Sequence, residues 1–505
     1  MKSVILLATL LATGITQANP PNVVLIMADD LGMGDISFYH RERTGEDSSP
    51  VPTPNIDRLI EMGMRFSDAH SPSALCAPTR FAMLTGNYPI RNAKPDGVWG
   101  VFANPLIDPD FTTIARIAKE GGYQTAFFGK WGLGGNWEKR PVTAEDFSSF
   151  PAGALSYGFD YALELPAGIQ DPPYAFYENR QFYPLAKDSI LTHIPVEQTG
   201  YDLDLAPKAA SRDGMGDSNW DPRLVGPRLA GKAVVFMENH VKNHPDQPFF
   251  LYYCSQAVHV PHVAAPSIDG QEIVGKTPGI LGDFIYEFDL QIGELLSALE
   301  SLGVMDDTLI ILTSDNGGLP PRWDMQLYAS GHRSNGGLDG YKGGILEGGH
   351  RVPFIAVWKD HIPAGSVCDT PIVSLDVVAT LSDLIGLPVD RNVIKDSASL
   401  LPIFRGEDVD EQRHFIHQSG GIRDFAIRQG DWKLTIDGDA MNRPKPQRYA
   451  FNPDDHEPSG LFNLGVSLSE DSSENLIENP EHRERVEAMF AKYVEIRSEQ
   501  IPTVD

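Results

Sequence analysis

Residues 22–35 read "NVVLIMADDLGMGD", and the fold class can be argued outward from them. The first six residues are a continuous run of apolar, mostly β-favouring side chains, a pattern typical of a strand buried on both faces of a parallel sheet. The run ends in two aspartates, Asp29 and Asp30. Open α/β sheets bind their ligands at the carboxyl ends of the strands. The stretch therefore predicts a sheet and a polar site at one edge of it.

Other segments repeat this pattern and alternate with helical periodicity. Further strand-like runs lie at 125–128 ("TAFF"), 248–253 ("PFFLYY") and 308–313 ("TLIILT"). Helix-like segments lie at 53–63, 111–121, 228–244 and 284–303. This alternation predicts an α/β fold with a large, mainly parallel mixed sheet sandwiched by helices.

Two regions depart from the alternation. Residues 134–222 are rich in Pro, Gly, Tyr and Trp without clear periodicity, which predicts long loops over the edge of the sheet. Near the C-terminus, 425–436 resembles two short strands and 483–498 an amphipathic helix. We therefore expect a large α/β domain over 19–395 and a smaller C-terminal α+β subdomain, a short antiparallel sheet plus a helix, over 396–505.

The N-terminus predicts export. Lys2 precedes the apolar run "VILLATLLATGI", which is followed by the small-residue sequence "TQA". This is the pattern of a signal peptide over 1–18, and the run is shorter than the ~20 residues that span a bilayer. We expect a periplasmic or secreted protein. The net charge of −28 argues against nucleic acid or an anionic membrane as partner.

Polar residues follow each predicted strand. Lys130 follows the second, His259 and His262 follow the third, and Asp315-Asn316 follow the fourth. The Asp315-Asn316 pair and the aspartate pair after the first strand offer only oxygen ligands, which suits Ca²⁺ or Mg²⁺ better than zinc. The sequence therefore predicts a hard divalent cation at this edge.

One of the three cysteines, Cys76, opens the segment "CAPTRFAMLTG", which looks like a loop entering a helix. A helix N-terminus attracts anions, and Arg80, Lys130 and Lys342 would help to hold a tetrahedral oxyanion there. The alternatives are a lone surface thiol or half of a disulfide. Cys254 lies in an apolar run, so we expect a buried structural thiol there.

The motifs as a set resemble those of the formylglycine-dependent sulfatases, within the alkaline-phosphatase-like superfamily. "CAPTR" matches the Cys-x-Pro-x-Arg pattern of that family. Other segments resemble further family blocks in the family's order and extend the resemblance over about residues 22–480: "NVVLIMADDLGMGD", "GKWGLG", "VHVPH", "TSDNG", "GYKGGILEGGHRVP" and "GLFNLGVSLSEDSSENLIENP".

The resemblance implies a role for individual residues. Cys76 would be oxidised to formylglycine by a dedicated maturation enzyme, and Arg80 would hold the resulting diol. Lys130 and Lys342 would bind sulfate oxygens, and His259 would protonate the leaving alcohol. One Ca²⁺ would be bound by residue 76 and by four further residues: Asp29, Asp30, Asp315 and Asn316.

The sequence departs from the family at one position. The family's Gly-Lys-Trp-His-Leu-Gly block has a histidine where this chain has Gly132. His193, His262 and His332 are candidates to replace that histidine or to contact substrate. The departure puts in doubt the second half-reaction, in which the sulfated residue 76 releases sulfate and returns to formylglycine, rather than the reaction class.

The substrate has to be inferred from the loops, because one core serves many sulfate esters in this family. Export, an acidic surface and aromatic loops favour a sulfated carbohydrate; an algal galactan such as carrageenan is our first choice, with glycosaminoglycan sulfates as the alternative. Two other classes stay open: a phosphoryl-transfer relative and a non-catalytic glycan-binding protein. The aromatic residues in question, most of which we expect to pack within loops, are Trp99, Phe102, Trp137, Tyr157, Tyr161, Tyr174, Trp220 and Trp323.

Overall fold

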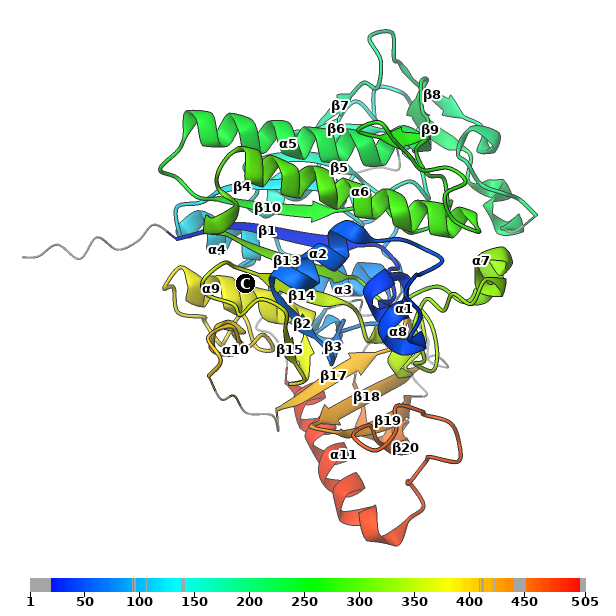
Figure 1. Ribbon diagram of the computed structural model, residues 1–505, viewed down its shortest axis with the longest axis vertical. Helices are drawn as coiled ribbons and strands as arrows, with labels where there is room; N and C mark the ends of the chain where they lie inside the picture. Colours follow the sequence, from blue (N-terminus) through cyan, green and yellow to red (C-terminus); the bar gives the residue numbers. More distant parts are fainter. Residues whose placement is uncertain are drawn as a thin grey trace, which may run out of the picture.

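The structure is a computed structural model, shown in Figure 1. It describes residues 20–499 except 93, 95–96, 106, 138–140, 205, 408, 410–412, 422 and 439–450. The predicted signal peptide therefore lies outside the described residues.

A ten-stranded mixed sheet forms the centre of the molecule, in the order β15-β2-β14-β13-β1-β10-β4-β5-β6-β7. The five neighbours from β13 to β5 run parallel to one another, and β14 and β6 pair antiparallel with the two ends of this set. The parallel strands are β13 (Thr308–Ser314), β1 (Asn22–Ala28), β10 (Phe249–Cys254), β4 (Gln124–Lys130) and β5 (Tyr161–Leu165). The flanking strands are β14 (Phe354–Val357), β2 (Met64–Phe66), β15 (Ser366–Cys368), β6 (Phe176–Glu178) and β7 (Gln181–Tyr183).

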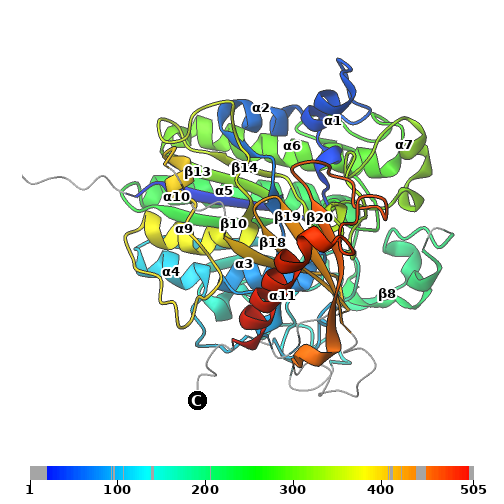
Figure 2. The same cartoon turned by 90° about the horizontal axis from the view of Figure 1, so that it is seen from below.

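Helices cover both faces of this sheet, as Figure 2 shows. Each face packs its own hydrophobic core against the buried strands, as the predicted sandwich requires. One layer contains α1 (Ser37–Thr44), α2 (Pro54–Met62), α5 (Val225–Asn243) and α6 (Ile280–Ser301). The other contains α3 (Cys76–Thr85), α4 (Ile114–Glu120) and α9 (Val377–Leu384).

The four strands and four helices expected from periodicity are all present. The expectation of long loops over 134–222 is wrong in part, because this region supplies β5, β6 and β7 of the main sheet. It also forms a separate hairpin of β8 (Leu191–Ile194) and β9 (Gly214–Asp217). These strands have only three to five residues, which is too short for a periodic pattern to stand out.

The C-terminal part of the chain forms a four-stranded antiparallel sheet and a helix, as predicted. The boundary near residue 395 stays a prediction. Tyr493 and Met489 of the helix are buried against Leu434 and Ile436 of the sheet. The elements are β17 (His414–Gln418), β18 (Asp424–Gln429), β19 (Trp432–Gly438), β20 (His456–Asn463) and α11 (Arg483–Ser498).

The C-terminal sheet also contacts the segment that leads into α3. β17 forms a parallel bridge between Gln418 and Ser73, and the Gln418 carbonyl accepts a hydrogen bond from the Ala74 N–H at 2.9 Å. The Gly343 N–H donates to the Ala74 carbonyl at 2.8 Å, so the loop carrying Lys342 joins the same junction. The C-terminal sheet therefore supports two loops at the carboxyl edge of the main sheet, the loop before α3 and the loop that carries Lys342.

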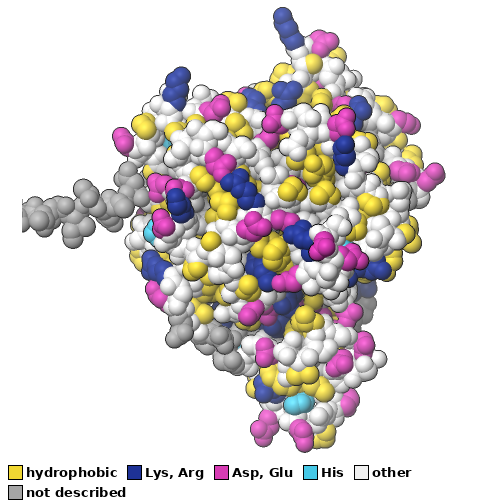
Figure 3. All heavy atoms as spheres, in the orientation of Figure 1, with side chains coloured by type: hydrophobic (Ala, Val, Ile, Leu, Met, Phe, Trp, Pro, Cys, Tyr) yellow, Lys and Arg dark blue, Asp and Glu magenta, His cyan; other side chains and the backbone are white. Residues whose placement is uncertain are grey.

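Acidic and basic side chains are interspersed on the face drawn in Figure 3. Among the described residues, no helix combines the length and apolar character needed to cross a membrane.

Candidate active site

Three buried carboxylates meet where β1 and β13 end. The two strands pair in parallel register from Asn22 with Thr308 to Ala28 with Ser314, so the residues that follow them lie side by side. Asp29, Asp30 and Asp315 are at most 1% exposed. The Asp30 N–H donates to Asp315 Oδ1 at 3.2 Å, which ties the two strand ends together. The predicted convergence of strand-end acids is present.

The oxygen atoms of this group fit a hard cation. Asp29 Oδ1 and Asn316 Oδ1 are buried and have no hydrogen-bond partner among the described residues. The Asn316 amide instead donates through its Nδ2 to Asp30 Oδ1 at 2.8 Å. Burial, with Asp29 nearby, raises the pKa of Asp315 to about 7. A divalent cation would satisfy the orphan oxygens and stabilise the ionised carboxylates, and an all-oxygen set suits Ca²⁺.

Cys76 is the first residue of α3 and lies against the same acids. It is 3% exposed, and burial raises the pKa of its thiol. Its sulfur and one oxygen each of Asp29 and Asp315 all lie within 4.8 Å of one another. None of the three cysteines, all of which lie in the described part of the chain, forms a disulfide, which excludes the disulfide alternative for Cys76. Cys254 is buried, as expected.

Three cationic side chains pair one to one with the three acids. Lys130 Nζ, at the end of β4, donates to Asp29 Oδ2 at 2.6 Å. Lys342 Nζ donates to Asp30 Oδ2 at 2.7 Å, and Arg80 Nη2, one turn into α3, donates to Asp315 Oδ2 at 2.7 Å. The carboxylates hold the pKa of both lysines above its usual value despite burial. Positive charge is thereby fixed next to Cys76 in a protein of strongly negative net charge.

His259 lies at the rim of this group with its side chain 12% exposed. Its Nδ1–H donates to the Val260 carbonyl at 2.8 Å. The other ring nitrogen, Nε2, lies 3.8 Å from Asp30 Oδ2. Burial, followed by Lys342, lowers the pKa of His259 to about 3, so the ring is neutral beside the lysine.

A cleft of about 360 Å³ opens beside Cys76 and Lys130. Of the eight aromatic residues singled out above, Trp99 and Phe102 line it, whereas the others pack in the protein interior, fully or in part. The region 134–222 also contributes five polar residues that periodicity does not reveal: Gln170, Asp171, Ser211, Arg212 and Asp213. Arg212 Nη1 donates to the Gln170 carbonyl at 2.8 Å and so fixes one wall of the cleft.

The three candidate histidines lie in three different settings. His193 is exposed on β8 and reaches Asp213 of the cleft wall, with Nε2 2.8 Å from Asp213 Oδ2. His262 is half-buried beside the ring of Trp323, and its buried Nε2 atom has no hydrogen-bond partner among the described residues. His332 is held by Asp35 at 2.7 Å, so it braces the turn after β1.

Gly132 lies in the cleft wall with φ of +73°, a left-handed conformation that disfavours other residues. A Cβ atom there would lie 3.3 Å from Cδ of Arg80. The position therefore faces Arg80 and Lys130. Because glycine has no side chain, the cleft stays open next to Arg80.

Comparison with known proteins agrees with this geometry. The family model described as Sulfatase matches residues 21–387. An N-acetylgalactosamine-6-O-sulfatase of Bacteroides thetaiotaomicron is 31% identical over 490 residues, covering 90% of this chain and 92% of that protein.

Solved structures share the fold. One, from work on the metabolism of multiple glycosaminoglycans by Bacteroides thetaiotaomicron, has a TM-score of 0.77 and 28% identity, covering 95% of this chain and 100% of that one. Another, Ps i-CgsB in complex with k-i-k-neocarrahexaose, has a TM-score of 0.67 and 23% identity, covering 96% and 95%. The chain therefore belongs to the sulfatase family and is a sulfuric ester hydrolase.

Proposed function

We propose that this protein removes sulfate from a sulfated carbohydrate, using formylglycine formed from Cys76 and one Ca²⁺. One observation carries the proposal: residue 76 lies at a helix N-terminus, at the base of a cleft, among three buried acids and three cations. Two oxygens there, Asp29 Oδ1 and Asn316 Oδ1, have no hydrogen-bond partner among the described residues. A hydrated formylglycine would supply a geminal hydroxyl that attacks sulfur. Ca²⁺, held by Asp29, Asp30, Asp315 and Asn316, would act as a Lewis acid on a sulfate oxygen.

The protein's own side chains would perform the remaining steps. Lys130 and Lys342 are placed to bind sulfate oxygens and offset charge as it develops, and Arg80 orients residue 76. His259 Nε2 would donate a proton to the leaving sugar oxygen. The lowered pKa of His259 applies to the site without substrate. A bound sulfate brings negative charge next to the ring, which raises this pKa and favours the imidazolium.

The cleft supports a sugar as the alcohol part of the ester. Trp99 and Phe102 offer apolar faces, and Asp171, Arg212 and Asp213 offer hydrogen bonds to hydroxyl groups. One relative is named an N-acetylgalactosamine-6-O-sulfatase, and one protein of similar fold was solved in complex with k-i-k-neocarrahexaose. We propose a galactan such as carrageenan or a glycosaminoglycan as the substrate, delivered to an exported enzyme in the periplasm or outside the cell.

The test is sulfate release from defined glycans: carrageenan oligosaccharides, ulvan, fucan, glycosaminoglycans and an aryl sulfate. The protein would be produced together with a formylglycine-generating maturation enzyme, and Cys76→Ala is the control. Release from one glycan class that disappears in the Cys76→Ala variant is the expected result. No release from any glycan, with formylglycine confirmed by mass spectrometry and calcium bound, would contradict the proposal and favour a glycan-binding role.

Metal analysis of the same protein distinguishes the phosphoryl-transfer alternative. We expect calcium in the acid cluster, whereas a relative of the two-zinc phosphatases would hold two zinc ions there and release phosphate from phosphate monoesters.

A further inference from the structure

The cleft beside Cys76 has two walls of different chemistry. One, which we call the apolar wall, comes from residues 98–102 and includes Trp99 and Phe102. The other, which we call the polar wall, comes from residues 170–172 and 211–213. A bound sugar would therefore meet apolar side chains at one wall and charged groups at the other.

The polar wall contains more negative than positive groups. Among the described residues that line it, the charged ones are Asp171, Arg212 and Asp213. Asp213 Oδ2 lies 2.8 Å from Nε2 of His193. With both aspartates ionised, one guanidinium against two carboxylates leaves one negative charge, which a protonated His193 would only cancel. The wall therefore has no surplus positive charge in either state of the histidine.

The guanidinium of the polar wall is already engaged by protein groups. Arg212 Nη1 donates to the Tyr201 hydroxyl at 2.7 Å and to the Gln170 carbonyl at 2.8 Å. The same nitrogen lies 3.3 Å from Asp171 Oδ1, and the guanidinium carbon lies 5.2 Å from the centre of the Tyr201 ring. These contacts fix the side chain in the wall and pair its charge with a carboxylate.

The base of the cleft differs from this wall. Lys130 lines the cleft there, and Lys342 belongs to the same group of buried charges around residue 76. These are the two side chains to which we assign the sulfate oxygens. The cleft therefore offers cationic groups to one anion at its base and no unpaired cation to a second anion at the polar wall.

We propose that the cleft accepts a sugar ring whose only anionic group is the scissile sulfate, and that Asp171 and Asp213 exclude a ring with a second sulfate. This inference rests on the proposed function. A second sulfate would either lose its hydration against the apolar wall or lie near two carboxylates of like charge. Hydroxyl groups avoid both costs, because they can donate to the aspartates and accept from Arg212.

The first experiment compares rings that differ only in a second sulfate, using the protein with formylglycine at residue 76. The rings are those of the glycan class hydrolysed in the panel above. For galactans and chondroitin they are galactose and N-acetylgalactosamine as the 4-sulfate, the 6-sulfate and the 4,6-disulfate, free and within oligosaccharides. We expect kcat/KM for the disulfated ring to be at least about 100-fold below that for the better monosulfated ring, because like charges repel in the cleft.

Failure of this inference can be told apart from failure of the proposed function. Comparable or faster sulfate release from the disulfated ring would overturn the exclusion and leave the sulfatase activity intact. A faster reaction would also show that Arg212 binds a second sulfate. No sulfate release from any ring or any glycan of the panel would contradict the proposed function, and the inference with it.

Asp213→Asn tests which group causes the exclusion. The amide keeps an oxygen for His193 but removes the negative charge, and Asp213 does not pair with Arg212 as Asp171 does. We expect the ratio of kcat/KM for the disulfated ring to that for the monosulfated ring to rise at least about tenfold. Damage to the fold would lower both values and would not produce this gain.

The matched control for Asp213→Asn is Glu300→Gln. Glu300 is an exposed acid at the end of α6 that pairs with Arg58 and does not line the cleft. Its loss removes the same charge from the protein as a whole and should leave the ratio unchanged. An unchanged ratio in folded Asp213→Asn protein, or an equal rise in both variants, would overturn the role of Asp213.

Discussion

Two buried clusters of this protein contain the same charges and leave different atoms unpaired. The cluster that we propose to be catalytic, called the catalytic cluster below, pairs Asp29, Asp30 and Asp315 with Lys130, Lys342 and Arg80. The interface cluster, under the C-terminal sheet, pairs Asp68, Glu347 and Glu470 with Arg428, Arg351 and Lys433. Each has three acids and three cations.

The difference lies in what remains after the pairing. Among the described residues, the catalytic cluster leaves only acceptors unpaired, a carboxylate oxygen of Asp29 and the amide oxygen of Asn316, next to a cleft. The interface cluster leaves both donors and acceptors unpaired in a closed interior: Glu470 Oε1, Arg428 Nη1 and His417 Nε2. Net charge alone does not distinguish a site for chemistry from a structural junction. The unpaired atoms and their access to solvent do.

Asp30→Asn tests the catalytic cluster and should have the largest effect. The change keeps the shape of the side chain but removes a charge that pairs with Lys342 and would bind Ca²⁺. We expect sulfate release to fall at least about 10³-fold, because a metal ion supplies several kcal/mol of transition-state stabilisation. Calcium content should fall in parallel, while the thermal midpoint falls less than in the Glu347→Gln variant, because the Lys342 side chain is 16% exposed whereas that of Lys433 is 0% exposed. Activity near that of the wild type would show that Asp30 is not part of the machinery.

Glu347→Gln tests the interface cluster and should show the opposite pattern. Removing this charge leaves Lys433 and Arg351 buried with too few counter-charges, which costs about 3–5 kcal/mol of unfolding free energy. The turnover of the protein that remains folded should be unchanged. Glu300→Gln is the control, because its pair with Arg58 is exposed and is worth less than about 1 kcal/mol. Equal losses from the two variants in urea denaturation would refute the distinction.

Glu164→Gln tests a buried acid that has no direct cation partner in either cluster. Burial raises the pKa of Glu164 to about 8, against 4.5 for the ordinary group, so the folded protein holds a proton there that the unfolded chain releases. Stability should therefore fall as pH rises from about 4.5 to 8, by about 1.4 kcal/mol per pH unit. The variant should lack this component of the slope, and its thermal midpoint should exceed that of the wild type at pH 7 but not at pH 4. Parallel pH profiles would rule the ionisation out.

Gly132→His should have the smallest effect. It restores the family's residue in sequence, but the left-handed backbone costs a non-glycine residue about 1–2 kcal/mol. The new Cβ would also press on Arg80. We expect a slightly lower thermal midpoint and no gain in turnover; Gly337→Ala, at a position with open space, is the control. A faster enzyme with unchanged stability would show that the cleft tolerates the histidine.

Prediction from sequence succeeds where a local pattern carries the information. Asp29 and Asp315 follow continuous apolar strands, and parallel pairing brings strand ends together, so their meeting could be foreseen. Cys76 is identified by the residues around it. Strand β5 was missed because five residues show no clear period, and with it the cleft residues Gln170 and Arg212.

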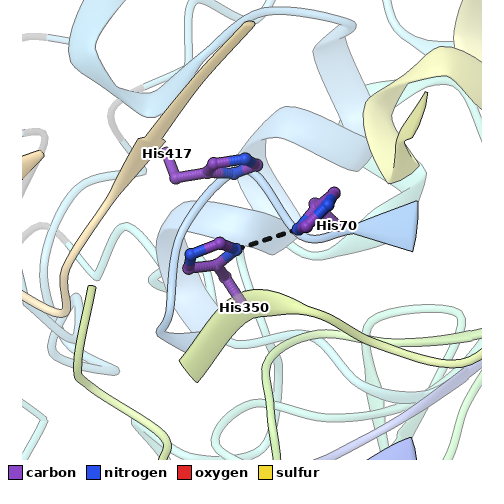
Figure 4. Close-up of side chains that lie close together, drawn as sticks. All are labelled: His70, His350 and His417. Carbon is purple, nitrogen blue, oxygen red and sulfur yellow. Dashed lines mark hydrogen bonds between the residues drawn. The ribbon is translucent and has the colours of Figure 1, made fainter. Parts of the chain in front are cut away.

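The meeting of His70, His350 and His417 in the interior (Figure 4) could not be predicted at all. His70 and His350 are separated by 280 positions, and no spacing rule connects them with His417. Their relation depends on how α8 (Glu347–His350) and β17 pack against β3 (Ala69–His70), which is a property of the tertiary structure. The His350 and His417 rings are further oriented by backbone carbonyls, and the His70 ring by the carboxylate of Asp68.

The contact between β17 and the loop before α3 has a consequence for the order of events during biosynthesis. Ala74 is hydrogen-bonded to Gln418 and Gly343, and both of these residues leave the ribosome well after Ala74 does. Until then the loop before α3 lacks its partner strand, and residue 76 has not yet been enclosed. The growing chain would thus pass through a period in which residue 76 is accessible for modification while the site is incomplete, and completion of the C-terminal sheet would end that period.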